Sequence, residues 1–406
     1  MATPALDALS PPTKGLSSIG PILAVAITSL VGVHTTYFAP IEIGAIIDRF
    51  SLSAAKGGTI LSIELGFVAL TSLLAGGWLS RANSHRIAIL TCFFVAMVNI
   101  ACAFPITDVL VLVGLRALAG IGAGLAFAIS CIWTARSAQP ARIYGIGVVL
   151  VSLVTAVAML PLSSIAGQGG LPTVFLSIGL ILTAATILLF WVHPAQRSDL
   201  ISDIDHNDMP VGNLSRLGLC SAVILSNMAL SIIWQFAERL GRQYGFGVTE
   251  IGFVLSISVA AGIGGSVAAA LVGDRFGYSR PLLAGMALGS LCGVLVSVQS
   301  GYVGYAIAIA LSEFGFLFIM PFLIGIGSWL DSSGKLAAVA GGLALTASAI
   351  SPIVGGTIVD LLSASASGWA CALFSLMAMA GLIPIAIAER SHRFDQANRL
   401  NMPDAF

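Results

Sequence analysis

Twelve apolar runs, each close to the length of a membrane span, dominate this sequence. A helix needs about 20 apolar residues to cross the hydrocarbon core of a bilayer. Only 9% of the 406 residues are charged, which is too few to cover the surface of a water-soluble protein of this size. The runs cover residues 19–45, 58–79, 87–105, 108–134, 143–166, 171–192, 217–238, 249–273, 281–299, 302–330, 336–361 and 367–388. The sequence therefore predicts an all-α membrane protein with twelve transmembrane helices.

Polar segments divide these runs into two sets of six. Residues 193–216 contain Pro194 and a series of aspartates, and they predict a linker between an N-terminal bundle (19–192) and a C-terminal bundle (217–388). Residues 1–18 and 389–406 are polar tails. The first tail lacks the pattern of a cleavable signal peptide, so we expect the helix over 19–45 to start membrane insertion.

The basic residues predict the orientation of the chain, because cytoplasmic loops are enriched in Lys and Arg. One side of the predicted topology carries Lys14, Arg81, Arg86, Arg136, Arg142, Arg197, Arg216, Arg275, Arg280, Lys335, Arg390, Arg393 and Arg399. The other side carries Arg49, Lys56, Arg239 and Arg242, and Arg116 lies inside a run. We therefore expect both termini and the linker in the cytoplasm, with the protein in the cytoplasmic (inner) membrane.

A charged turn between two apolar runs occurs once in each predicted bundle. The second copy reads Leu-Val-Gly-Asp-Arg-Phe-Gly-Tyr-Ser-Arg over 271–280, and a degraded copy, Gly-Trp-Leu-Ser-Arg-Ala-Asn-Ser-His-Arg, lies over 77–86. Without gaps, Arg81 in the first copy aligns with Asp274 in the second. The recurrence indicates two bundles related by an internal repeat.

The whole pattern resembles the major facilitator superfamily of secondary transporters. The likeness covers roughly residues 19–390. The family's turn between helices 2 and 3 reads Gly-x-Leu-Ala-Asp-Arg-x-Gly-Arg-Arg and recurs between helices 8 and 9. The run over 108–134 adds Arg116-Ala-Leu-Ala-Gly120-Ile-Gly122-Ala-Gly124, which is close to the family's helix 4 motif. The resemblance implies two pseudo-symmetric six-helix bundles and transport by alternating access.

By this resemblance, the charged turns form a cytoplasmic gate. The residues are Asp274, Arg275, Gly277 and Arg280 in the second copy, and Gly77, Arg81 and Arg86 in the first. In the family the Asp and Arg of the turn join two helices and hold the gate shut. Here Arg81 replaces the acid of the first copy, so we expect the second copy to dominate. The alternative is that these are ordinary basic loops.

The charged candidates within the predicted spans are Glu42, Glu64, Arg116 and Glu313. Glu238 and Asp360 lie near the outer ends of their spans and are weaker candidates. Charges inside a bilayer are costly and usually functional. A carboxyl group in apolar surroundings holds a proton more tightly than in water, and a nearby Arg opposes this, so such a pair can act as a proton switch. The alternative for Arg116 is a structural ion pair with Glu42 or Glu64, and for Glu313 a structural hydrogen bond.

Two polar stripes at helical spacing add candidate substrate residues. His34, Phe38 and Glu42 share one helix face, as do Asn227, Ser231 and Gln235. In the family, helices 1, 4, 7 and 10 line the central cavity, so these stripes, Tyr37, Arg116 and Glu313 are expected there. His34 is either a proton carrier or a hydrogen-bonded core residue.

These residues favour a proton-coupled symporter for a small organic solute, with an organic anion as the narrower expectation from Arg116. The alternatives are a proton antiporter that exports drug-like compounds and a transporter-fold sensor without flux. The exporter motif of helix 5 is matched at Pro161 but not at Ala156 or Leu160.

No catalytic, nucleotide-binding or Cys/His metal motif is visible, so we expect no enzyme activity, cofactor or metal. A net charge of zero gives no reason to expect nucleic acid. The expected partners are the solute, protons and the lipid bilayer, with the protein as a monomer.

Overall fold

The computed structural model describes residues 19–79, 84–137, 139–192, 194, 213–273, 275–298, 301–331 and 335–390. All regular secondary structure in these residues is helical, as the apolar runs predicted. The helices are α1 (Ile19–Phe50), α2 (Ala54–Leu79), α3 (Ser84–Ala101), α4 (Val109–Ala135), α5 (Pro140–Leu189), α6 (Asn213–Gln235), α7 (Ala237–Gln243), α8 (Val248–Val272), α9 (Ser279–Ser297), α10 (Gly301–Leu330), α11 (Lys335–Leu361) and α12 (Ala366–Gly381).

Eleven helices in the described residues are long and apolar enough to cross a membrane. One of them, over Arg142–Leu189, has 48 residues, whereas a straight helix of that length would be about 70 Å long. The backbone of α5 leaves helical geometry at Gly170, where φ is 61° and ψ is −152°. A positive φ of this size favours glycine, because it has no Cβ.

The two parts of α5 run in opposite directions. Before the break, Gly147 lies beside Val25 near the start of α1, and Gly167 lies beside Val248 at the start of α8. After it, Gly179 packs on Ile100 near the end of α3. The carbonyl groups of Leu189 and Val192 then lie within 3.2 Å of His85 Nε2, at the start of α3. The chain therefore crosses the bundle, turns at Gly170 and returns.

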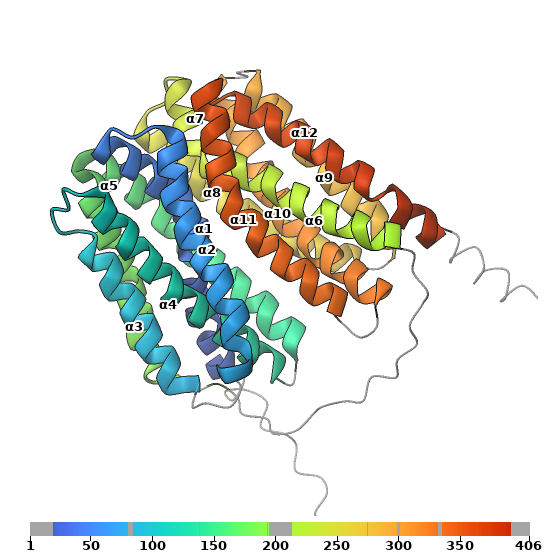
Figure 1. Cartoon of the computed structure of the whole chain (residues 1–406), viewed down its shortest axis with the longest axis horizontal. Helices are drawn as coiled ribbons and strands as arrows, with labels where there is room; N and C mark the ends of the chain where they lie inside the picture. Colours follow the sequence, from blue (N-terminus) through green and yellow to red (C-terminus); the bar gives the residue numbers. More distant parts are fainter. Residues whose placement is uncertain are drawn as a thin grey trace, which may run out of the picture.

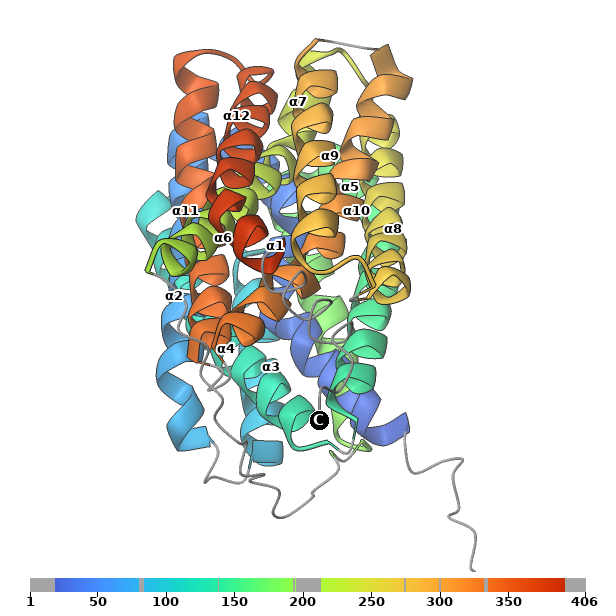
Figure 2. The ribbon, with the colours of Figure 1, turned by 90° about the vertical axis from the view of Figure 1, so that its right-hand side faces the viewer.

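The helices separate into two groups in space. Figure 1 shows most of the blue-to-green helices on one side and most of the lime-to-red helices on the other. We call α1–α5 the first half and α6–α12 the second half. The halves meet along two extended seams, one between α2 and α11 and one between α5 and α8. Figure 2 shows the long helices side by side along the bundle.

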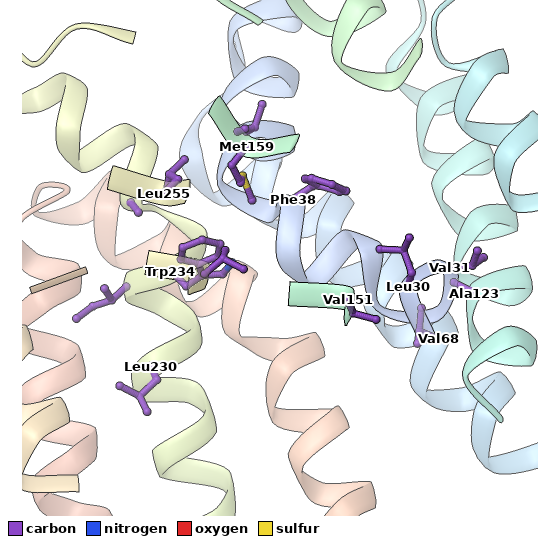
Figure 3. Packing of buried hydrophobic residues seen from close by; sticks show 14 of the residues in the cluster. Leu30, Val31, Phe38, Val68, Ala123, Val151, Met159, Leu230, Trp234 and Leu255 are labelled. Carbon is purple, nitrogen blue, oxygen red and sulfur yellow. The ribbon is translucent and has the colours of Figure 1, made fainter. Parts of the chain in front are cut away.

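Apolar side chains fill the space between the halves. Phe38 of α1 is fully buried, as is Leu255 of α8, and Trp234 of α6 is 4% exposed. They belong to one continuous core with residues of α2, α4 and α5, which Figure 3 shows at close range. Large apolar side chains such as Leu74 are exposed on the outside, as expected for a surface that faces lipid.

Helix boundaries differ from the predicted ones mainly at the ends of the bundle. The first predicted run, over 19–45, continues as α1 to Phe50, and α2 already begins at Ala54. The run over 217–238 is longer at its start and is interrupted at Phe236, between α6 and α7. Helix α6 begins at Asn213, inside the predicted linker. Polar residues at helix ends carry no apolar signal, so hydropathy placed these boundaries too far inside the helices.

We call the end of the bundle where α1 begins the terminal end, and the other end the far end. Helix α1 reaches the far end at Phe50, where α2 begins. The end of α11 meets the start of α2, since Asp360 accepts a hydrogen bond from the backbone N–H of Ala54.

Candidate functional site

A buried polar network lies inside the first half, centred on Arg116 of α4. The guanidinium of Arg116 lies 3.4 Å from the carboxylate of Glu64 on α2. Its Nη1 also donates to the side-chain oxygen of Asn99 on α3, at 3.3 Å. All three side chains are fully buried. The sequence had left Glu42 and Glu64 open as partners of Arg116, and the structure pairs it with Glu64.

Two glycines let α4 approach α2 closely enough for this pair to form. A Cβ on Gly120 would overlap the carbonyl oxygen of Glu64, and one on Gly124 would lie 2.6 Å from that of Val68. Arg116, Gly120 and Gly124 are spaced four residues apart and so share one helix face. The close backbone approach, typical of small-xxx-small motifs, places Arg116 directly against α2.

Two further groups of the first half contact Arg116, whereas its buried Nε has no hydrogen-bond partner among the described residues. Its Nη2 lies 3.2 Å from the sulfur of Cys102, and its guanidinium carbon lies 4.3 Å from the ring centre of Phe175 on α5, a cation–π geometry. Arg116 was predicted to line the central cavity. In the structure each of these contacts comes from the first half, so Arg116 lies within this bundle and not between the two.

Glu42 of α1 lies next to this network but does not share in its hydrogen bonds. The residue is fully buried, and neither carboxyl oxygen has a hydrogen-bond partner. It lies near enough to Glu64 and Arg116 to interact electrostatically with both. One buried guanidinium therefore faces two acidic side chains, of which only Glu64 is paired.

The hydrogen bonds of His34 favour its neutral form. Its Nδ1 lies 2.8 Å from the carbonyl oxygen of Val31, so this nitrogen donates. Asn99 uses its oxygen for Arg116, so its amide nitrogen faces His34 Nε2 at 3.3 Å and donates to it. Thr35 donates to Glu64 at 2.8 Å. His34 thus joins the network, and its Nε2 also lies 3.8 Å from Glu64 Oε1 and 3.2 Å from Thr35 Oγ1.

Sequence reasoning missed four members of this network. They are Thr35, Asn99, Cys102 and Phe175. Asn99 is a polar residue in an apolar run, which is a signal that the search for polar stripes at helical spacing did not use. The other three residue types are common in membrane helices, so no sequence signal could have found them.

The second half offers neutral polar groups instead. Gln235 of α6 and Ser351 of α11 exchange hydrogen bonds of 2.9 and 3.1 Å. The amide of Asn227 donates to Val223 of its own helix, and Ser231 is 7% exposed. The polar stripe on α6 is therefore buried, and Gln235 is the member that joins it to another helix.

Tyr37 of α1 and Glu313 of α10 interact electrostatically across the two halves. Glu313 is 7% exposed. The hydroxyl of Tyr37 lies 3.2 Å from that of Ser152 on α5. Tyr37 therefore has its hydrogen bond outside the Arg116 network.

The charged turn between α8 and α9 is described in part. Gly277 is buried with a φ of 77°, which explains why glycine suits this position. Arg275 and Arg280 are exposed, as is Arg86 at the start of α3. Gly77 lies in α2. Asp274 and Arg81, the residues that distinguish the two copies, lie outside the described residues.

Polar contacts join the halves at the far end. Asp48 of α1 forms ion pairs with Arg239 and Arg242 of α7, at 2.6 and 2.8 Å. Glu238 pairs with the same two arginines. Burial raises the pKa of Glu238, and the two arginines oppose this shift. A cavity of about 340 Å³ opens here between α1, α5, α7 and α8.

Within the described residues, no group of three or more His, Cys, Asp or Glu side chains is arranged to hold a metal ion. The six cysteines lie singly on their helices and none is paired.

Comparison with known proteins identifies the family. The family model of the Major Facilitator Superfamily matches residues 23–356. Among solved structures, the chain is similar to a D-xylose-proton symporter, with a TM-score of 0.70, 17% identity and coverage of 90% of this chain and 97% of that one. It is equally similar to a mutant of the nucleoside transporter NupG, with a TM-score of 0.70, 12% identity and coverage of 89% and 99%. No curated protein sequence matched. The resemblance noted in the sequence is confirmed: this chain belongs to the Major Facilitator Superfamily and is a membrane transporter, not an enzyme.

Proposed function

We propose that the chain crosses the cytoplasmic membrane twelve times with both termini inside. The reversal of α5 at Gly170 supports two crossings within that helix. The excess of Lys and Arg at the terminal end supports the orientation. In this arrangement 1–18 and 389–406 are cytoplasmic tails, 193–216 is a cytoplasmic linker and the far end faces outward. We propose a monomer, because each half finds its partner within the same chain.

We propose that the protein is a proton-coupled symporter of a small organic solute. The observation that carries this is the imbalance of charge in the buried network. One guanidinium faces two carboxyl groups, and the hydrogen bonds of His34 favour a neutral ring. An unpaired buried carboxylate costs several kcal/mol, so one of the two acids holds a proton. Glu42 is that acid, because Glu64 is the one paired with Arg116 and Thr35.

This arrangement provides a proton switch. If helix motion brings Arg116 nearer to Glu42 than to Glu64, Glu64 becomes the less stable anion and takes up the proton. Helices α1, α2 and α4 carry the three groups, so a small relative shift changes the pairing. Arg116 is enclosed by protein groups, which supports a coupling role for it, with His34 as a hydrogen-bonded support.

We assign solute contact to the polar groups that lie nearer the interface between the halves. These are Glu313, Tyr37, Asn227, Ser231 and Gln235. Glu313 and Tyr37 come from different halves, so a solute between them would feel the relative motion of the bundles. Because the guanidinium of Arg116 is paired with Glu64, it does not favour an organic anion over other solutes. Direct measurement of binding identifies the class of solute.

The cytoplasmic gate formed by the charged turns remains a prediction. The left-handed backbone at Gly277 supports the family-like turn in the second copy. We expect Asp274→Asn to lower transport while membrane expression stays normal. Unchanged transport at equal membrane levels would count against a gate role for this turn.

Proton coupling is tested in proteoliposomes that contain a pH-sensitive dye. A thermal-shift screen over organic acids, sugars and drug-like amphiphiles first selects the solute. Symport acidifies the vesicle interior when solute is added outside. Antiport makes it more alkaline, and a sensor binds solute without a pH change or flux. Glu42→Gln should still bind solute but lose proton movement, whereas Glu250→Gln, an exposed cap of α8, should retain it.

A further inference from the structure

The seam between α2 and α11 is tightest at the far end. A Cβ on Gly58 would overlap the carbonyl oxygen of Pro352, and one on Gly356 would overlap that of Ala54. The hydroxyl of Ser62 accepts a hydrogen bond of 3.1 Å from the backbone N–H of Ile353. The two backbones are thus in direct contact here, and any separation of the halves at this end must open this seam.

Asp360 holds the seam with a carboxylate placed on a helix N-terminus. The residue lies in the last turn of α11. Its two oxygens accept hydrogen bonds from the backbone N–H groups of Ala54 and Ala55, at 2.8 and 2.9 Å. These are the first residues of α2, whose N–H groups have no partner within the helix. The positive end of the α2 dipole adds to the attraction.

We propose that Asp360 is a latch that keeps the far end closed, by capping a helix of the other half. The contact exists only while the halves are together at this end. Asp360 is exposed, so water replaces the lost hydrogen bonds when the seam opens, and the latch is reversible. This device is separate from the Arg116 network and goes beyond the proton-coupling proposal.

Two other carboxylates supply matched controls. Glu250 accepts a hydrogen bond of 2.7 Å from the backbone N–H of Gly247, at the start of α8. Asp108 accepts one of 2.8 Å from that of Leu110, at the start of α4. Both cap a helix at the far end, as Asp360 does. Each cap lies within one half, so relative motion of the halves does not break it.

The test measures the seam directly by electron–electron distance spectroscopy. Spin labels at Lys56 and Leu362, both exposed at the far end, report the separation of α2 and α11 in lipid nanodiscs. The accessible Cys131 and Cys220 are replaced by serine in this background. Asp360→Asn should raise the ratio of long to short distances about fivefold, as expected for one helix-terminal charge interaction. Asp108→Asn and Glu250→Gln should leave it unchanged.

Three further variants distinguish the latch from a simple folding defect. Asp360→Glu keeps the carboxylate and should restore most of the short-distance population. Gly356→Ala inserts a methyl group into the seam and should favour long distances, whereas Gly341→Ala on the same helix, with open space around it, should not. A distribution for Asp360→Asn that coincides with Glu250→Gln would overturn the proposal. No solute or pH gradient is present, so this result is independent of the symport test.

Discussion

The two halves of this transporter share an architecture but differ in what they bury. The first half encloses a guanidinium, two carboxyl groups, an imidazole and a carboxamide, all fully buried. At the matching place the second half has the neutral pair of Gln235 and Ser351 and one acid, Glu313. The sequence repeat aligns Glu42 with Gln235, so the acidic member of that pair lies in the first half.

Two halves of one pseudo-symmetric fold can therefore bury polar groups of different charge. Buried charges are expensive unless paired, and removing one partner leaves the other uncompensated. The first half is therefore sensitive to single charge changes, whereas a neutral hydrogen-bonded pair tolerates them better. We therefore expect single substitutions of the buried charges in the first half to cost more than substitutions of the neutral pair in the second.

Removing Arg116 should be the most damaging change. Arg116→Met leaves the Glu64 carboxylate unpaired in the core and should lower the free energy of unfolding by about 3–5 kcal/mol near neutral pH. Denaturant titration in detergent micelles measures this loss. A loss below about 1 kcal/mol would contradict the pairing of Arg116 with Glu64.

The two acids of the network should substitute for one another. Glu42→Gln should change the free energy of unfolding by less than about 1 kcal/mol, because the proposed state of that side chain is the neutral acid. Glu64→Gln should also be tolerated in part, since Glu42 can then ionise and pair with Arg116. The double variant removes both partners, and we expect a coupling energy of about 2 kcal/mol in the double-mutant cycle. Additive effects would show that only Glu64 serves Arg116.

The glycine contact between α2 and α4 should contribute less. Gly120→Ala places a methyl group against the carbonyl oxygen of Glu64 and should cost about 1.5 kcal/mol through overpacking. Gly114→Ala on the same helix meets open space and should be neutral or slightly stabilising. The difference between the two midpoints of thermal unfolding measures the contact. Equal midpoints would mean that α4 can move away from α2 without cost.

The neutral pair of the second half should show the smallest effect. Ser351→Ala removes the hydrogen-bond partner of Gln235 and should lower the free energy of unfolding by about 1 kcal/mol, with no dependence on pH between 5 and 8. The same denaturant titration applies. A loss as large as that of Arg116→Met would remove the proposed contrast between the halves.

Hydropathy and motifs were enough to predict the membrane environment, the family and the charged residues whose burial costs free energy. Apolar run length and charge distribution predicted a helical membrane protein. The two sets of six runs, the repeated charged turn and the motif at Arg116, Gly120 and Gly124 predicted the family. The same pattern singled out Glu42, Glu64 and Glu313 as intramembrane charges. These features are local, because hydropathy and helical spacing are properties of a single segment.

Which polar side chains contact one another became clear from the tertiary structure. It chose Glu64 over Glu42 as the partner of Arg116, added Asn99 and Cys102, and enclosed Arg116 within the first half. It also brought Asp360 onto the first turn of α2, more than 300 residues earlier in the chain. Helical periodicity fixes which side chains share a face, but the rotation and close approach of neighbouring helices depend on contacts between segments far apart in sequence. The proposed function rests on those contacts, since a proton switch of this kind needs two specific acids beside one specific base.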